Sequence, residues 1–233
     1  PYGSHSYEII YRYTLQAVAE LFDRGCPLVI LACNTASAKA LRTIQQNDLP
    51  QLDATRRVLG VIRPTVEAVG SLSHTRHVGV LATAGTINSG SYEMELRKLW
   101  PDMTVTGQAC PMWVPLVENK EYDSPGADYF VKKYIDQLMQ RCADIDTVIL
   151  GCTHYPLLLP KIRQFMPLGV TVVPQGEIVA HSLADYLRRH PEIEQCCSRG
   201  GSTEYLTTES ASKFEQSASV FMNVDIKAKR ITL

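Results

Sequence analysis

Two stretches decide the fold of this 233-residue chain: Val29-Ile30-Leu31-Ala32-Cys33 and Val148-Ile149-Leu150-Gly151-Cys152. Each is a short apolar run rich in branched residues, which predicts a β-strand that is covered on both faces. Each run ends in a small residue and a cysteine, with a threonine close behind. The two motifs lie about half a chain length apart, which is too far for a solenoid repeat and suits two similar α/β halves.

Predicted strands and helices alternate outward from these two motifs. Apolar runs predict strands at 28–32, 58–62, 78–82, 105–109, 147–150 and 170–173. Helical periodicity predicts helices at 4–24, 36–46, 64–71, 91–99, 124–142, 158–165 and 177–189. This alternation indicates a parallel α/β architecture. We expect loops at 83–90 and around Glu118, and a less periodic tail after Pro191 with short strands at 205–208 and 226–233.

The two strand-end thiols, Cys33 and Cys152, are the candidate catalytic groups. Ligands of open α/β sheets sit beyond the carboxyl ends of the strands, where both cysteines are expected. Inversion of a stereocentre needs a base on one face and an acid on the other, and two thiols can serve if their surroundings lower their pKa. We expect each thiol at a helix N-terminus, which favours an anion. His154 is expected to share a proton with Cys152.

Polar residues directly after the thiols are candidates for substrate binding. Asn34, Thr35 and Thr153 offer hydrogen-bond donors at the predicted helix N-termini, which suits a carboxylate. Thr83 and Thr86 follow another predicted strand, and their hydroxyls and amides can bind an anion, although an ordinary loop has the same pattern. We expect Glu118 to be a solvated carboxylate.

Packing is the alternative explanation for each cysteine, because cysteine often fills cores as a small hydrophobe. The matched pair, each followed by polar residues, favours function over packing. The chain has no C-x-x-C motif, and Cys152 and His154 are too close in sequence for a usual zinc site. It also has no Walker loop and no dinucleotide fingerprint, so we expect no metal and no cofactor.

Composition narrows the class of partner. The formal net charge is -1 and the sequence pI is about 6.7, whereas a nucleic-acid partner calls for a basic surplus. The sequence has no apolar run long enough to span a bilayer and no signal peptide, so we expect no membrane partner. Seven irregularly spaced cysteines argue against a disulfide framework and predict a reducing, cytoplasmic location.

These residues resemble a known family, the bacterial glutamate racemases of the aspartate/glutamate racemase superfamily. The resemblance rests on the segments around Cys33 and Cys152, on Pro1-Tyr2-Gly3, and on the segments 83–92 and 110–118. The Cys-Thr-His element at 152–154 is specific, since related aspartate racemases typically carry Glu at the position of His154. The match covers most of the chain, to about Asp185.

The resemblance implies cofactor-independent interconversion of L- and D-glutamate, which supplies D-glutamate for peptidoglycan. It implies that Cys33 and Cys152 are the acid/base pair and that His154 assists Cys152. The substrate would be held by seven residues: Tyr2, Gly3, Asn34, Thr35, Thr83, Thr86 and Thr153. It also implies that each chain has two similar parallel-sheet α/β domains, which face each other across a cleft. Two such chains would form a homodimer. The first domain would comprise 1–62 with 174–233, and the second 63–173.

One departure concerns the start of the chain. Members of the family carry a strand and an Asp-Ser-Gly turn before the Pro-Tyr-Gly loop, and this sequence has neither. We therefore expect that upstream material is missing and that the 233-residue chain is poorly active or unstable.

Three other functions stay open at this point. A racemase for another amino acid, such as aspartate, would use the same two thiols. A thiol hydrolase would use Cys152 as nucleophile and His154 as base, with no need for Cys33. A non-catalytic amino-acid-binding domain would exchange no α-hydrogen with solvent.

Overall fold

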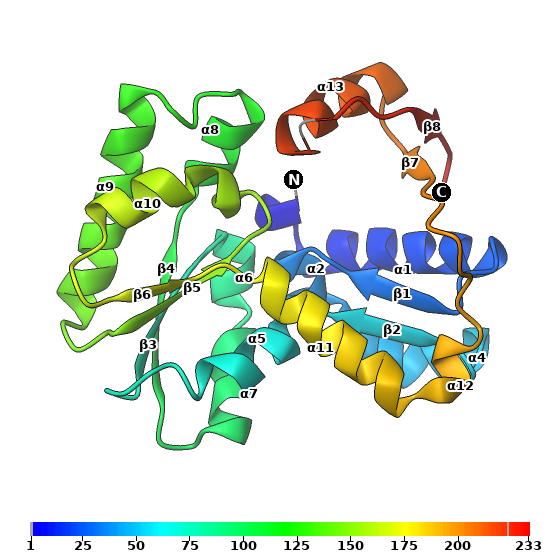
Figure 1. Cartoon of the computed structure of the whole chain (residues 1–233), viewed down its shortest axis with the longest axis horizontal. Helices are drawn as coiled ribbons and strands as arrows, with labels where there is room; N and C mark the ends of the chain where they lie inside the picture. The colour runs from blue at the N-terminus through cyan, green and yellow to red at the C-terminus, as the bar shows by residue number, and fades with distance from the viewer. Residues whose placement is uncertain (1, 223) are drawn as a thin grey trace.

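The computed structural model describes residues 2–222 and 224–233. It has an α/β fold with parallel sheets, as the sequence predicts, and Figure 1 shows two halves side by side. One half holds a four-stranded sheet. The other holds the β1–β2 sheet, with the small β7–β8 sheet above it.

The four-stranded sheet has the order β4-β3-β5-β6, and all neighbouring strands are parallel. The strands are β3 (His77–Ala82), β4 (Thr104–Ala109), β5 (Thr147–Gly151) and β6 (Thr171–Val173). Every residue of β5 is buried. Its side chains alternate between two cores: Val148 and Leu150 pack in one, Ile149 in the other. This two-sided burial explains why β5 has a continuous apolar sequence rather than an alternating one.

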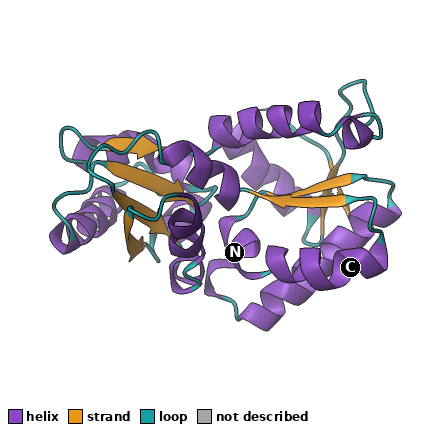
Figure 2. Cartoon of the chain, turned by 90° about the horizontal axis from the view of Figure 1, so that it is seen from below, coloured by secondary structure: helices purple, strands orange, loops and turns teal. Residues whose placement is uncertain are grey.

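Helices cover both faces of this sheet (Figure 2). One core contains residues of α8 (Trp113–Glu118), α9 (Pro125–Arg141) and α10 (Leu159–Phe165). The other contains residues of α5 (Ile62–Val69) and α7 (Ser91–Leu99). The Ser124 side chain accepts a hydrogen bond from the backbone N–H of Ala127, and Pro125 opens the helix, so α9 begins where the sequence predicts.

The other half is built on β1 (Leu28–Leu31) and β2 (Arg57–Gly60), which pair in parallel. Helix α1 (Tyr7–Asp23) is capped by Ser6 and buries Val18 and Phe22 in the adjoining core. The chain between the strands forms α2 (Asn34–Lys39), α3 (Leu41–Thr43), a π-helical turn (Ile44–Asp48) and α4 (Leu49–Leu52).

After β6 the chain forms α11 (Gly176–Arg189), which lies beside the β1–β2 half in Figure 1. A short α12 (Pro191–Glu194) follows. The strands β7 (Tyr205–Thr207) and β8 (Ala228–Arg230) then pair in parallel, with α13 (Ala211–Met222) between them.

Three segments differ from the loops or irregular tail that the sequence predicts. Residues 84–88 form α6 (Ala84–Asn88), because Thr83 caps this turn and accepts from the backbone N–H of Thr86. Residues 113–118 form α8, whose Trp113, Val114, Leu116 and Val117 are buried. Residues 211–222 form α13, so the tail is more helical than its polar composition indicates. Of the residues described, no helix is both long and apolar enough to cross a membrane.

Candidate active site

Cys33 follows β1 after one intervening residue, Ala32, and is the N-cap residue of α2. Its carbonyl accepts from the backbone N–H of Ser37, which starts the helix. The thiol is half-buried. This position is the predicted one: the carboxyl end of a parallel strand, beside the unpaired N–H groups of a helix N-terminus.

Cys152 lies directly after β5, but the predicted helix N-terminus is wrong here. A turn at 152–154 leads into a 3₁₀ helix that begins at Tyr155. The thiol is buried, with 9% of the residue exposed, and it borders the core beneath α8–α10. Two backbone N–H groups, those of His154 and Thr153, face the sulfur and favour its thiolate in place of a helix end.

The condition that the surroundings lower the thiol pKa is not met at Cys152 in the free protein. The pKa of Cys152 is raised to about 12, because burial and the charge of Cys33 together outweigh the effect of the two backbone N–H groups, with burial the largest cause. Burial first, and then the charge of Cys33, likewise raise the pKa of Tyr2. The charge of Cys33 therefore acts on both Cys152 and Tyr2.

A chain of three side chains leads from Cys152 to a carboxylate. The Cys152 Sγ lies 3.7 Å from Nδ1 of His154. The His154 Nε2 lies 2.6 Å from Oε1 of Glu118. A carboxylate at Nε2 favours the tautomer with hydrogen on that nitrogen, which leaves Nδ1 free to accept a proton from the thiol.

Glu118 was missed as a functional residue by the sequence reasoning, which treated it as a solvated carboxylate in a loop. It ends α8, a helix held by its buried apolar residues. The apolar residues around Pro115 are the sequence signal for this helix. The proline does not argue against a helix, because proline is tolerated in the first turn.

Three threonine hydroxyls, which come from two segments of the chain, form a triangle. The Thr35 Oγ1 lies 3.0 Å from that of Thr83 and 3.1 Å from that of Thr86, and the last two are 3.2 Å apart. Thr35 belongs to α2, whereas Thr83 is the N-cap residue of α6 and Thr86 lies within that helix. The structure therefore brings these three predicted residues together at the N-termini of two helices.

The Tyr2–Ser4 turn packs against this triangle. A side chain at Gly3 would place its Cβ 2.8 Å from Cβ of Thr83, and one at Gly85 would place its Cβ 2.8 Å from the carbonyl oxygen of Gly3. Only glycines allow this close approach. Pro1, which belongs to the predicted Pro-Tyr-Gly loop, lies outside the described residues.

The remaining predicted residues are Asn34 and Thr153. Asn34 is almost fully buried, and its side-chain amide bonds Gln175 and Tyr92. Thr153 is exposed beside Cys152. In the described part of the chain, no group of three or more His, Cys, Asp or Glu residues is arranged to hold a metal ion.

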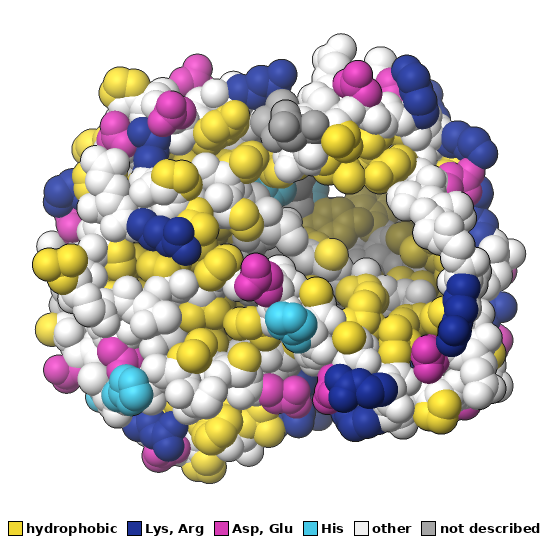
Figure 3. Space-filling model, in the orientation of Figure 1, with side chains coloured by type: hydrophobic (Ala, Val, Ile, Leu, Met, Phe, Trp, Pro, Cys, Tyr) yellow, Lys and Arg dark blue, Asp and Glu magenta, His cyan; other side chains and the backbone are white. Residues whose placement is uncertain are grey.

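A cavity of about 590 Å³ adjoins the predicted site, and Gly3, Thr83, Cys110 and Glu118 are among its lining residues. Helix α13 closes part of it with Lys213 and Ser217. The Phe221 ring of the same helix meets the His154 ring edge-on, with centroids 5.7 Å apart. Figure 3 shows that the surface is hollowed below α13 and the β7–β8 sheet, with hydrophobic side chains around the hollow.

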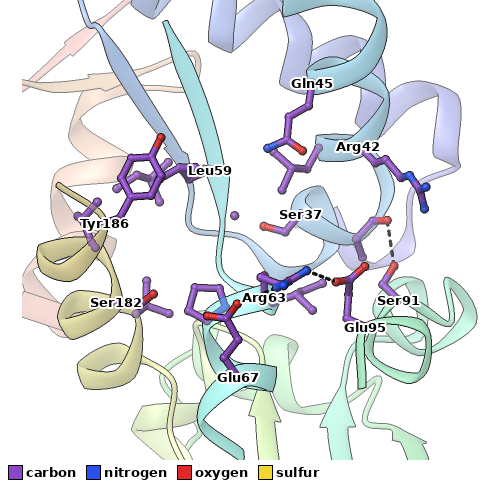
Figure 4. Close-up of a pocket in the computed structure, with 18 of the residues that line it drawn as sticks. Ser37, Arg42, Gln45, Leu59, Arg63, Glu67, Ser91, Glu95, Ser182 and Tyr186 are labelled. Atoms are coloured by element: carbon purple, nitrogen blue, oxygen red, sulfur yellow. Dashed lines mark hydrogen bonds and ion pairs between the residues drawn. The ribbon is translucent and has the colours of Figure 1, made fainter. Parts of the chain in front are cut away.

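A second cavity of about 560 Å³ lies against the β1–β2 sheet and is bounded by α5, α7 and α11 (Figure 4). Arg63 pairs there with Glu67 and Glu95. Neither Cys33 nor Cys152 is among the lining residues of either cavity.

Comparisons with known proteins show the family of the chain. The family model described as Asp/Glu/Hydantoin racemase matches residues 6–183. A glutamate racemase from Ruegeria sp. (strain TM1040) is 39% identical over 97% of this chain and 84% of its own length.

Solved structures give the same result. A glutamate racemase isoform from Bacillus anthracis superposes with a TM-score of 0.89 at 31% identity, covering 100% of this chain and 84% of that one. The enzyme from Francisella tularensis, solved in complex with D-glutamate, gives a TM-score of 0.84 at 25% identity, covering 100% and 82%. With two strand-end thiols and a match over most of its length, the chain belongs to the Asp/Glu/Hydantoin racemase family.

Proposed function

We propose that this chain interconverts L- and D-glutamate without a cofactor, using Cys33 and Cys152 as the two acid/base groups. The observation that carries the proposal is the pair of thiols, each at the carboxyl end of a parallel strand, with the charge of Cys33 acting on Cys152. The identity to glutamate racemases, 36% to 40% over nearly the whole chain, supports glutamate as the substrate.

The reaction transfers one proton out of the substrate and one proton in. A thiolate on one face takes the α-hydrogen as a proton, which leaves a carbanion at Cα, and the thiol on the other face donates a proton to it. The active enzyme must therefore hold one thiolate and one thiol at a time, and each turnover exchanges their states. His154, with Glu118 behind it, can take the proton of Cys152 and return it.

The polar residues of the site are suited to hold the rest of the substrate. The Thr35–Thr83–Thr86 triangle and the backbone N–H groups at the starts of α2 and α6 form a donor set for a carboxylate. We assign Tyr2, Gly3, Asn34 and Thr153 to the same binding site because they lie on the segments that carry the triangle and the thiols.

The domain division and the biological setting belong to the same proposal. Strands β3–β6, within 63–173, form one sheet, and β1–β2 and β7–β8 come from the rest of the chain, which supports two α/β domains with the site between them. We further propose a cytoplasmic enzyme that supplies D-glutamate for peptidoglycan and acts as a homodimer, on the support of the family resemblance.

The deciding experiment follows the substrate α-hydrogen in deuterated water. We expect the chain to exchange the α-hydrogen of L-glutamate with solvent deuterium and to produce D-glutamate, over hours if turnover is slow. Cys33→Ser and Cys152→Ser should each lower racemisation by at least about 100-fold, because each removes one proton-transfer group. Cys26→Ser, which changes a half-buried cysteine away from the site, is the control. Exchange no faster than the enzyme-free background would reject the proposal.

One observation favours a second candidate. The Cys152–His154–Glu118 chain also matches the nucleophile, base and orienting carboxylate of a thiol hydrolase. A hydrolase forms a covalent acyl-enzyme on Cys152 and keeps its activity in Cys33→Ser. Mass spectrometry of the protein during turnover separates the two, since the racemase forms no adduct.

A further inference from the structure

Gln175 lies between β6 and α11 and occupies the N-cap position of α11 without capping it. Its side chain instead contacts residues distant in sequence. Oε1 accepts a hydrogen bond of 2.7 Å from Nδ2 of Asn34. Nε2 donates to the hydroxyl of Tyr92 at 2.6 Å and to Oγ1 of Thr65 at 2.8 Å.

These contacts close into a ring. The Tyr92 hydroxyl donates to Oδ1 of Asn34 at 2.7 Å, so Asn34, Gln175 and Tyr92 each bond the other two. The Thr65 hydroxyl donates onward to the carbonyl of Val61 at 2.8 Å. Within these bonds each donor hydrogen meets one acceptor, and no two donors face each other.

Three side chains of the network are buried and Gln175 itself is half-buried, so its bonds are costly to break. Asn34 is 2% exposed, Tyr92 4% and Thr65 0%. Burial raises the pKa of Tyr92 far above its usual value, so its hydroxyl keeps the proton that it donates to Asn34. Leaving a buried polar group without its partner is unfavourable, so the network favours this one arrangement.

The network fixes which way the Asn34 amide faces. Oδ1 is held by Tyr92 and Nδ2 by Gln175, so a 180° flip of the amide would set donor against donor and acceptor against acceptor. One hydrogen of Nδ2 is left over. Asn34 is the first residue of α2 and directly follows Cys33, the N-cap residue. Holding the Asn34 side chain therefore also holds the N-terminus of α2, where the Cys33 thiol lies.

We propose that Gln175 is a positioning residue, which holds the Asn34 amide and the Cys33 end of α2 in the orientation that proton transfer requires. This inference rests on the proposed racemase function. Gln175 contacts Tyr92 and Thr65 on α7 and α5, which pack on the four-stranded sheet, and Asn34 on α2 beside the β1–β2 sheet. It therefore connects the two halves at the level of the site.

The test compares Gln175→Leu with Gln137→Leu. Leucine keeps the approximate size of the side chain and removes all three Gln175 hydrogen bonds. Gln137 is also half-buried and bonds a side chain, accepting from Nε2 of Gln108 at 3.1 Å, but it lies on α9 outside the network. Gln175→Glu is the second variant: it keeps the acceptor for Asn34 and loses the donors, so it should be less impaired than Gln175→Leu.

The first readout is the steady-state rate with D- and L-glutamate, protonated and deuterated at Cα. We expect Gln175→Leu to lower kcat by about 10- to 100-fold with a smaller change in KM, as for a small displacement of a catalytic group. The two enantiomers present the α-hydrogen to opposite thiols. The isotope effect on kcat/KM should therefore rise for one enantiomer and fall for the other, whereas Gln137→Leu should leave both unchanged.

The second readout needs no turnover. The rate of iodoacetamide alkylation at Cys33, located by mass spectrometry, should change in Gln175→Leu and not in Gln137→Leu, with urea unfolding confirming that both variants are folded. Unchanged alkylation and isotope effects in folded Gln175→Leu would overturn the inference. If the unaltered chain shows no α-hydrogen exchange, the racemase proposal fails, and the alkylation rate alone then decides whether Gln175 positions Cys33. If Gln175→Leu does not fold, Gln175→Glu is judged by the same two readouts.

Discussion

Cys152 stands at the boundary between a hydrophobic core and a polar site. Its position at the end of a fully buried strand gives a neutral thiol an apolar environment, while His154 and two backbone N–H groups face its sulfur. The balance of these effects favours the protonated form in the free protein. A bound ammonium group would shift the balance toward the thiolate, so we expect the thiol to become a base mainly when the substrate is present.

The raised pKa of Cys152 also predicts how the stability of the folded protein depends on pH. Burial raises its pKa from 9.0 to about 12, so the folded state holds the proton more tightly than the unfolded state. The stabilisation is fully present below pH 9 and is lost as the pH rises toward 12. From pH 8 to pH 10.5 this thiol should lower the free energy of unfolding by about 2 kcal/mol.

Urea unfolding of the unaltered chain and of Cys152→Ala at both pH values checks this. The variant should lose about 2 kcal/mol less over the interval, because other buried groups such as Tyr92 and Cys110 titrate in both proteins. Equal losses in the two proteins would show that the thiol is not desolvated as described.

At the scale of elements, the site depends on how closely η1 (Tyr2–Ser4) approaches α6. Gly3 and Gly85 make the contact, and the threonine triangle lies against it. The short helix α6 is held by its Thr83 cap, so Thr83 both starts a helix and belongs to the proposed binding site.

Gly85→Ala should therefore weaken substrate binding more than folding. The new Cβ would lie 2.8 Å from the Gly3 carbonyl oxygen and 3.1 Å from Cγ2 of Thr35, and backbone must move to relieve the overlap. We expect KM for glutamate to rise by about tenfold or more, as the threonine hydroxyls are displaced. Gly126→Ala is the matched control on α9, where the new Cβ meets only the Ser124 hydroxyl at 3.4 Å. An unchanged KM in Gly85→Ala would remove η1 and α6 from the binding site.

At the scale of the molecule, the proposed substrate is held by both halves. Cys33 and Asn34 come from the β1–β2 half, and Cys152, Thr83 and Thr86 from the half with the four-stranded sheet. A ligand that contacts both should stabilise the two halves together, and the Gln175 network already connects them in the free protein.

This arrangement predicts the effect of glutamate on thermal unfolding. At 100 times its dissociation constant, a ligand of the folded state adds about 2.7 kcal/mol. For a chain of this length, that raises the melting temperature by roughly 5–10 °C. D-Glutamate should produce one shifted transition by calorimetry, and L-lysine none. A larger shift with D-aspartate than with D-glutamate would favour the aspartate alternative.

The sequence by itself determined the α/β class, the order of the strands of both principal sheets along the chain, and the position of both thiols at strand ends. These follow from local pattern, because a doubly covered parallel strand must be continuously apolar and its carboxyl end is the common place for a ligand. The resemblance to glutamate racemases added the predicted substrate and the residues proposed to hold it.

Only the tertiary structure decided how these residues meet. Glu118 reaches His154 across 36 residues, and Gln175 reaches Asn34 across 141, so no local periodicity carries either contact. The sequence pattern does not predict the helices α6 and α8, because the first depends on its Thr83 cap and the second on the burial of its apolar residues more than on intrinsic propensity. The sequence does not determine the raised pKa of Cys152 for the same reason: desolvation depends on which side chains surround the sulfur, and the fold alone brings them there.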